Sequence, residues 1–263
     1  MSRTDPKAKY YRIGSLEKGV KIIDLLTRRG PLSLSEVAAE LKVDRSVCHR
    51  ALLTLRDLGL VSQPGGSGYR LTMSLFEMGM RLVNRLEVKQ VVRPFMEKLS
   101  GTYRETVNLG IKDGDQVVYL DRTESTQLVR ADLAIGTRIP IHCTALGKAI
   151  LANLPIEESD RIFEKPLEKL TEKTNVDRIR LLEEFADVRL SGYSVDDEGI
   201  EHGLYCLAVP IYNYTGSVVA AISISGPFNR VTENRQKVVQ ELKSLGGMIS
   251  RRLGYVKAMR SRI

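Results

Sequence analysis

The residues with the clearest chemistry follow Asp44, where the chain reads Arg-Ser-Val-Cys-His-Arg. Arginine donates hydrogen bonds in a fixed fork, which suits the O6 and N7 atoms of guanine and also suits DNA phosphates. At 100° per residue, Arg45, Ser46, His49 and Arg50 fall on one arc of a helix, within its first two turns. In helix-turn-helix domains, the N-terminal turns of the second helix contact base edges. The pattern therefore predicts a surface that reads DNA.

Two short helices are expected before this surface. Ser15 can cap a first helix that ends at Gly30 and carries apolar residues at helical spacing: Leu16, Val20, Ile23 and Leu26. Ser33 and Glu36 form a capping box that opens a second helix. Two helices joined by a short turn are the arrangement of a helix-turn-helix domain.

The third helix is expected to extend from Arg45 to about Leu58, with Asp44 as its cap. Its buried stripe is predicted to comprise Val47, Ala51, Leu55 and Leu58. Leu52 and Leu53 fall near the DNA-reading arc, and we expect them to pack on a following element.

A glycine-rich turn, Pro64–Gly68, joins two short β-prone runs after this helix. It predicts a hairpin, the wing of a winged helix-turn-helix domain. It is not a phosphate loop, because the lysine and Ser/Thr that such a loop needs are missing after the last glycine. We assign to the DNA-binding surface Lys42, Arg45, Ser46, His49, Arg50, Tyr69 and Arg70.

Nearly all of the excess positive charge lies in the first third of the chain. The chain carries 40 Lys+Arg and 32 Asp+Glu, a net charge of +8. Residues 1–85 hold 15 basic and 8 acidic residues, a net +7, whereas residues 86–263 hold 25 and 24. A basic lobe on a nearly neutral body is typical of a protein that contacts a polyanion with one part. We expect double-stranded DNA to be that partner.

The composition argues against several other classes of protein. Hydrophobic residues make up 43% of the chain, yet no apolar run approaches the ~18 residues that a membrane-spanning helix needs. The first 15 residues lack the apolar core of a secretory signal, and three cysteines cannot pair completely. We therefore expect a cytoplasmic protein in a reducing compartment, with no membrane partner.

The period of the apolar residues changes after the first third, which divides the chain. We expect a flexible arm over residues 1–13, a winged helix-turn-helix domain over 14–72, a linker helix over 73–87 and an effector-binding domain over 88–263. The linker is apolar over a wide arc, so it suits dimer contacts.

The effector-binding domain is predicted to be α+β, with helices flanking an antiparallel sheet in a GAF/PAS-like arrangement. A hairpin turn is expected at Asp113–Gly114, between two alternating runs. The remaining strands are expected over residues 127–133, 193–195, 205–212 and 217–225. Helices are expected over residues 92–103, 144–154 and 231–253, and mainly surface helices over 157–190.

Four residues, His142, Cys143, His202 and Cys206, could instead hold a metal or act in catalysis. They suit zinc chemically, but their only close pair is a pair of sequence neighbours. A thiol enzyme needs a base beside its nucleophile. We expect poor geometry for His142–Cys143, because adjacent strand residues point to opposite faces, and we interpret Cys206 as a small buried hydrophobe. A metal-responsive regulator is the alternative function and a thiol-dependent enzyme the weaker one.

Taken together, segments spread over about residues 15–253 resemble the IclR family of bacterial transcription regulators. They are VDRSVCHR (43–50), PIHCTALGKA (140–149), GYSVDDE (192–198), GLYCLAVP (203–210) and AISISGP (221–227). Gly199 departs from the pattern, since the family usually has a second glutamate there. The resemblance implies a homodimer, often a tetramer, that binds a near-palindromic operator and is not an enzyme.

The resemblance also implies a pocket for a small organic, aromatic or sugar-derived acid, with no cofactor. The matching positions are Leu128, Leu133, Thr144, Ala145, Asp196, Cys206, Ser223 and Ser225. Amides at the start of a helix near Thr144 favour an anion, and the two serines share one strand face. Arg130 could instead pair with the anion, although we prefer to interpret it as exposed. We expect a repressor of a catabolic operon, with the linker helix transmitting effector binding.

Overall fold

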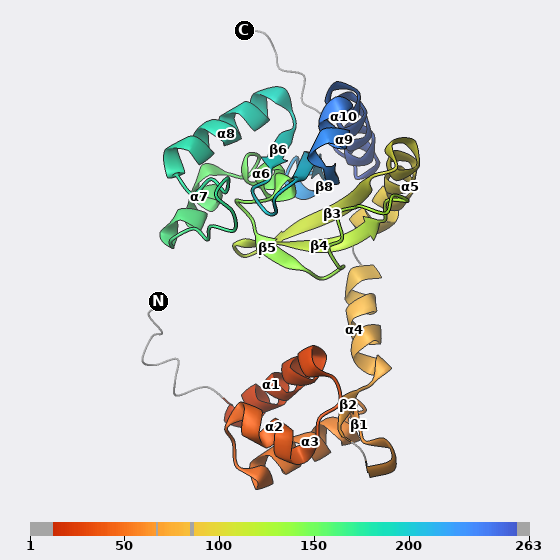
Figure 1. The fold of residues 1–263 in the computed structure, drawn as a ribbon, viewed down its shortest axis with the longest axis vertical. Coiled ribbons are helices and arrows are strands. Elements are labelled where there is room, and N and C mark those ends of the chain that lie inside the picture. The colour runs from red at the N-terminus through yellow and green to blue at the C-terminus, as the bar shows by residue number, and fades with distance from the viewer. Residues whose placement is uncertain (1–12, 67, 85–86, 257–263) are drawn as a thin grey trace. The chain divides into compact units, whose positions relative to one another are not determined.

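The computed structural model describes residues 13–66, 68–84 and 87–256 (Figure 1). The chain forms two compact units, residues 1–85 and 86–263, which are described separately below. The expected flexible arm lies outside the described residues, apart from its last residue. The first unit includes the helix that follows the wing.

The first unit contains three helices, a hairpin and a fourth helix. The elements are α1 (Gly14–Arg29), α2 (Leu34–Leu41), α3 (Arg45–Asp57), β1 (Val61–Ser62), β2 (Arg70–Leu71) and α4 (Met73–Asn84). The capping box of α2 is confirmed: the Glu36 amide donates to the Ser33 hydroxyl, and the Ser33 amide donates to the Glu36 carboxylate. The expected Ser15 cap is wrong, because α1 begins at Gly14 and the position before it is Ile13, which makes no side-chain cap.

The buried face of α3 differs from the predicted stripe. Cys48, Leu52 and Leu55 are buried, while Leu58 is 65% exposed. These three residues fall within about 60° of one another at 100° per residue, a tighter arc than the predicted one. The prediction omitted Cys48, which behaves as a small hydrophobe here. Leu52 therefore belongs to the core of this unit.

The wing is tied to the start of α2 as well as closed on itself. β1 pairs with β2, and an isolated bridge joins Leu32 to Tyr69. The Leu32 amide donates to the Tyr69 carbonyl at 3.0 Å, and the Tyr69 amide donates to the Leu32 carbonyl at 2.7 Å. Gly68 permits this approach, since a Cβ there would lie 2.9 Å from the Leu32 backbone.

The second unit is built on a six-stranded antiparallel sheet. Its order is β5 (Arg138–Pro140), β4 (Gln116–Thr123), β3 (Thr106–Asp113), β8 (Val218–Pro227), β7 (Leu204–Tyr212) and β6 (Ser194–Asp197). The predicted hairpin at Asp113–Gly114 is confirmed by the pairing of Asp113 with Gln116. Figure 1 shows helices on both faces of this sheet. The α+β class is therefore confirmed.

The helices of this unit differ from the prediction mainly at their ends. They are α5 (Glu87–Tyr103), α6 (Ala145–Leu151), α7 (Ile156–Ser159), α8 (Arg178–Ser191), α9 (Phe228–Glu233) and α10 (Arg235–Arg252). α5 begins earlier than expected and contains Pro94. The closing helix is broken at Asn234, whose φ and ψ are −102° and 9°. The region between α7 and α8 is largely irregular rather than helical.

The predicted strand over residues 127–133 is wrong. Its backbone does not pair in the sheet; instead, side chains donate to alternate carbonyls along it. Arg230, Thr106 and Arg122 donate to the carbonyls of Val129, Ala131 and Leu133 at 2.8, 2.9 and 2.7 Å. This segment is therefore irregular, and side chains hold it in place of a neighbouring strand.

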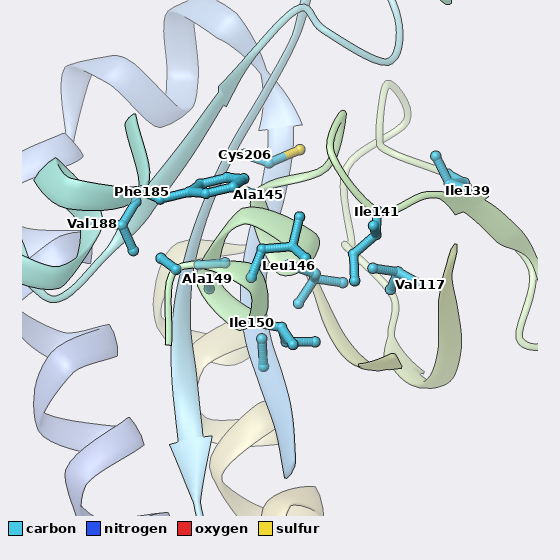
Figure 2. Close-up of a cluster of buried hydrophobic side chains, with 14 of the residues drawn as sticks. Val117, Ile139, Ile141, Ala145, Leu146, Ala149, Ile150, Phe185, Val188 and Cys206 are labelled. Carbon is cyan, nitrogen blue, oxygen red and sulfur yellow. The ribbon is translucent and has the colours of Figure 1, made fainter. Parts of the chain in front are cut away.

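Two glycines allow close contacts at helix α6, one with the turn that precedes the helix and one with strand β3. A Cβ on Gly147 would lie 1.8 Å from the Ile141 carbonyl oxygen, and a Cβ on Gly110 would lie 2.9 Å from the Leu146 side chain. Figure 2 shows Leu146 pointing toward Ile141, with Phe185 of α8 on the other side of the helix. The close approach fixes the start of α6 over the sheet.

We predict that Gly147→Ala destabilises the second unit by about 3 kcal/mol or more, because the added methyl overlaps a backbone oxygen and α6 must move. Gly101→Ala in α5 is the control, since nothing lies within 4 Å of a Cβ there. It should be neutral or stabilise the unit by up to about 1 kcal/mol. Urea denaturation of both variants measures the difference, and equal stabilities would contradict the packing.

Candidate DNA-binding surface and effector pocket

The N-terminal turns of α3 present a polar surface in the first unit. Arg45, Ser46, His49 and Arg50 are all exposed, as their predicted role requires. Lys42, just before this helix, is also exposed and adopts a left-handed conformation with φ of 53°. This conformation turns the chain between α2 and α3 within three residues.

Of the two wing residues that were predicted to contact DNA, one is exposed and one is buried. Arg70 is exposed, and its Nε lies 3.4 Å from the Ser62 hydroxyl. Tyr69 is only 3% exposed and packs in the core of the unit with Leu32. Its predicted side-chain contact with DNA is therefore wrong, because the bridge to Leu32 turns this residue inward.

In the second unit, strand register places several predicted pocket residues on one face of the sheet. Asp196 is opposite Cys206, and Cys206 is opposite Ser225. Directly paired residues in antiparallel strands project to the same face. All three side chains are buried, on the face that α6 covers. The structure thus brings residues from three strands into one row.

Ser223 occupies the neighbouring row on the same face. It is opposite Ala208 on β7 and Asn108 on β3, and Ala208 is opposite Ser194 on β6. The Ser194 hydroxyl donates to the Ala145 carbonyl at 2.6 Å, which ties this row to the first residue of α6. The Thr144 hydroxyl caps α6 by accepting the Gly147 amide at 2.7 Å. Thr144 and Ala145 therefore lie beside the two polar rows.

Asp196 is the most constrained acid of the site. Its side chain is fully buried, and its Oδ1 accepts the Gly199 amide at 2.8 Å. Burial raises its pKa to about 6, although nearby Lys148 and the Gly199 amide act in the opposite direction. A Cβ on residue 199 would lie 2.6 Å from the same oxygen. Glycine at this position allows this close contact.

Asn108 is a polar residue of this face that the sequence analysis missed. It is 1% exposed, and its Nδ2 donates to the Ser225 hydroxyl at 3.3 Å. The available signal was its alternation between Val107 and Leu109 in a run predicted to be a strand. A buried asparagine on the face opposite its apolar neighbours needs polar partners.

Of the two leucines predicted for the pocket, one lies near it and the other does not, and Arg130 is exposed, as expected. Leu133 packs against the core beneath α6, but Leu128 is 98% exposed, so the structure does not place it in the pocket. Arg130 lies 3.6 Å from the Glu124 carboxylate at the surface. We therefore carry Leu133, but neither Leu128 nor Arg130, into the proposed site.

An open cavity of about 940 Å³ approaches the buried rows from the side of α8. Cys143, Asp196 and Gly199 lie at its inner side, together with Ser194 and Lys148. Lys148 pairs with Glu184 at 2.7 Å. The cavity gives Asp196 a route toward solvent, while Cys206, Ser223 and Ser225 lie deeper in the sheet.

The proposed metal or thiol site does not form from its four residues. His142 and Cys143 lie in a turn, not a strand, so the expectation that they diverge is wrong: Cys143 Sγ is 3.4 Å from His142 Nε2. Burial raises the pKa of Cys143 to about 12 and lowers that of His142. His202 faces Glu172 and Glu198 instead. The described residues contain no cluster of three metal-binding side chains.

These two units define a class: a helix-turn-helix DNA-binding domain joined to an α+β domain with a polar internal site, as in ligand-controlled transcription regulators. Family models agree with this class. The model of the IclR helix-turn-helix domain matches residues 15–65, and that of the C-terminal domain of the bacterial transcriptional regulator IclR matches residues 80–251. The chain belongs to the IclR family of bacterial transcription regulators, which are not enzymes. Within the described residues, no helix is long and apolar enough to cross a membrane.

Individual relatives agree along most of the chain. The transcriptional repressor AllR of Escherichia coli is 36% identical over 84% of this chain and 83% of its own length. The crystal structure of Thermotoga maritima IclR matches with a TM-score of 0.80 and 30% identity, covering 93% of this chain and all of that one. An IclR homologue from Microbacterium hydrocarbonoxydans, complexed with 4-hydroxybenzoate, matches with a TM-score of 0.79 and 24% identity over 90% of this chain and 99% of that one.

We predict that the protein loses stability as pH rises through the titration of Asp196. The folded state holds the proton up to about pH 6, whereas an unfolded aspartate releases it near 3.8. The folded state therefore binds more protons between these values, so the burial penalty is absent below pH 3.8 and complete above about pH 6. The penalty is on the order of 3 kcal/mol.

Asp196→Asn removes this titration and serves as the reference. Urea denaturation at pH 4.5 and 7.5 should show a larger loss of stability in the unmodified protein than in the variant. Equal pH dependence of the two proteins would contradict the burial of this carboxyl group.

Proposed function

We propose that this protein is a repressor that releases its operator when a small organic, aromatic or sugar-derived acid binds the second unit. The observation that carries the proposal is the joining of two features in one chain: exposed arginines on the first turns of α3, and a row of buried polar groups beneath α6. The name of AllR as a repressor supports the direction of control. We place this action in the cytoplasm, with the chromosome, and expect a catabolic operon to be the target.

The DNA-binding surface supports direct contact with a duplex. Arg45 and Arg50 can each donate bidentate hydrogen bonds to guanine or contact phosphates, while Ser46 and His49 can donate to either. Lys42 and Arg70 lie outside the helix turns and suit phosphate contacts, which position a protein but do not read sequence. The buried Tyr69 side chain is not part of this proposal.

A homodimer is the assembly that we propose for this function. The first unit exposes large apolar side chains on two helices: Leu16 and Val20 on α1, and Met73, Phe76 and Met78 on α4. Exposed apolar surface of this kind marks an interaction site. Two copies would bind half-sites of a near-palindromic operator spaced about 10 bp apart or a multiple of that. A tetramer would pair two such dimers.

Control by the effector requires that effector binding and operator binding be thermodynamically linked. A ligand changes operator affinity only as far as it binds the DNA-competent and DNA-incompetent states unequally, and a coupling of about 1–3 kcal/mol is typical. We propose that α4 transmits this difference, because it directly follows the wing in the chain. The complex of the Microbacterium hydrocarbonoxydans homologue with 4-hydroxybenzoate supports a small acid as the type of ligand.

We predict that Arg50→Ala weakens operator binding by about 10-fold or more, since a lost bidentate contact costs about 1–3 kcal/mol. Arg56→Ala is the control, because Arg56 is an exposed arginine near the other end of the same helix. Fluorescence anisotropy with the upstream promoter fragment measures both affinities. If Arg50→Ala binds as tightly as the control, Arg50 does not belong to the reading surface.

We predict that the double variant Ser223→Ala/Asp196→Ala loses its response to the effector but still binds the operator. Both side chains project from the sheet face beneath α6, far along the chain from the DNA-binding unit. Operator release is measured against a panel of organic and sugar acids. A normal response by the double variant would show that the pocket lies elsewhere.

A further inference from the structure

Helix α8 of the second unit carries apolar side chains on two opposite faces. Three of them face inward and are buried: Leu181, Phe185 and Val188. Ile179, Leu182 and Leu190 face outward, and they are 70%, 37% and 88% exposed. A helix that is apolar on one side only has its other side in water, whereas a helix that is apolar on both sides is normally covered on both. The outer face of α8, at the periphery of the second unit in Figure 1, is therefore an interaction surface.

The apolar residues on this outer face have the spacing of a seam between paired helices. Together with an alanine, they recur at intervals of three and four residues: Ile179, Leu182, Ala186 and Leu190. At 100° per residue these four fall within about 80° of one another. The first three have the a, d, a spacing of a coiled coil. Arg189 occupies the next d position and donates to the Ala152 carbonyl at 3.0 Å, so the seam ends on Leu190 beside it. The spacing favours another helix as the partner.

Charges of opposite sign border this seam. On the helix surface, Glu183 and Asp187 lie on one side of it, and Arg178 and Arg189 lie on the other. Both acidic residues are exposed, and neither forms an ion pair within the part of the chain that the structure describes. The Arg178 side chain is 58% exposed, although it lies 2.9 Å from Asp160. A face with one acidic and one basic border is complementary to a second copy of itself.

The two borders also decide how two copies of α8 align. In an antiparallel symmetric pair each border meets itself, which places acid against acid. In a parallel symmetric pair the acidic border of one copy meets the basic border of the other. Parallel helices bring position g of one chain beside position e of the next heptad of the other, five residues further on. With Ile179 as position a, these are Arg178 and Glu183 of the second copy, and symmetry forms this pair twice.

The seam is too short to hold two free chains together. The 11 residue steps from Ile179 to Leu190 rise by about 16.5 Å. Four side chains over this length bury much less than the ~800 Å² per partner of a standard interface. The seam suits chains that are already held in dimers. Two dimers can form two such contacts, and the second then forms at a high effective concentration.

We propose that the outer face of α8 binds the same face of a second copy of this chain, with the two helices parallel, and that this contact joins two dimers into a tetramer. The inference rests on the proposed homodimer and assigns the surface through which dimers associate. Ile179, Leu182 and Ala186 pack against their counterparts along the two-fold axis. Arg178 pairs with Glu183 of the second copy on each side of the seam.

The first test measures the assembly of the full-length protein by sedimentation velocity over a range of concentrations. The unmodified protein should form tetramers. Ile179→Glu should weaken the association of dimers by about 100-fold or more, because each contact loses apolar area and gains two facing charges. Ile135→Glu is the matched control, since Ile135 is an isoleucine of the same unit that is 57% exposed and lies outside α8. Circular dichroism checks that both variants fold.

The outcomes separate this inference from the proposed homodimer. Tetramers that persist in Ile179→Glu, or equal dissociation of Ile179→Glu and Ile135→Glu, would overturn the α8 contact. Dissociation of Ile179→Glu to monomers would also overturn it, because the face would then hold the dimer itself. Unmodified protein that stays dimeric at every concentration would overturn the contact and leave the homodimer standing. Unmodified protein that is monomeric would overturn both proposals.

Charge reversal tests the parallel alignment. Glu183→Arg should weaken the association of dimers by about 10-fold or more, because it places two like charges side by side at each pair with Arg178. The double variant Glu183→Arg/Arg178→Glu reverses the pair and should restore the association. Antiparallel helices predict the opposite, since Glu183→Arg would relieve the meeting of acid with acid. Unchanged or tighter association of Glu183→Arg, or no rescue in the double variant, would overturn the parallel pairing.

Discussion

The close packing at the start of α6 is the constraint on which the second unit depends. Gly147 lies so close to the Ile141 carbonyl that no side chain fits, and the helix is only seven residues long. Its first residues are held by the Thr144 cap and by the bond from Ser194. Because a short helix has little stability of its own, these contacts decide where it begins. The polar rows beneath it are kept from water for the same reason.

In the proposed pocket, ligand recognition and stability depend on the same buried groups. Asp196 is fully buried, with one oxygen bonded to Gly199 and the other without a hydrogen-bond partner. A ligand that satisfies such groups removes a cost already present in the free protein, so binding and folding are linked. The glycine at position 199 contributes by letting the backbone approach the carboxylate closely.

Sequence periodicity predicted which helices and strands form better than it predicted their buried faces and their first and last residues. The capping box of Ser33, the hairpin at Asp113 and the main strands follow from local chemistry, and the structure confirms them. The buried stripe of α3 was misjudged because one cysteine was not counted as apolar. The segment over residues 127–133 was predicted to be a strand from its residue pattern, but its alternate carbonyls accept from distant arginine and threonine side chains, which no local pattern shows.

The pocket was predicted by resemblance more than by physics. Asp196, Cys206 and Ser225 do share a row, but strand order, which sets that row, is a long-range property that spacing along the chain does not encode. For the same reason Asn108, more than a hundred residues away from Ser225, was missed. Tyr69 was predicted to contact DNA because it lies in the wing. The backbone bridge to Leu32 instead turns its side chain into the core, and this long-range contact is also not visible in the local sequence.

That bridge also limits how a signal can act on DNA binding. Two backbone hydrogen bonds between Leu32 and Tyr69 fasten the hairpin to the connection between α1 and α2, and the tyrosine ring is embedded among the helices. The hairpin and the reading helix thus form a single block whose internal angle is fixed. In the proposed homodimer, regulation is left with the separation and relative rotation of two such blocks, so ligand binding would change the spacing between the two DNA-binding surfaces and not the internal structure of either one.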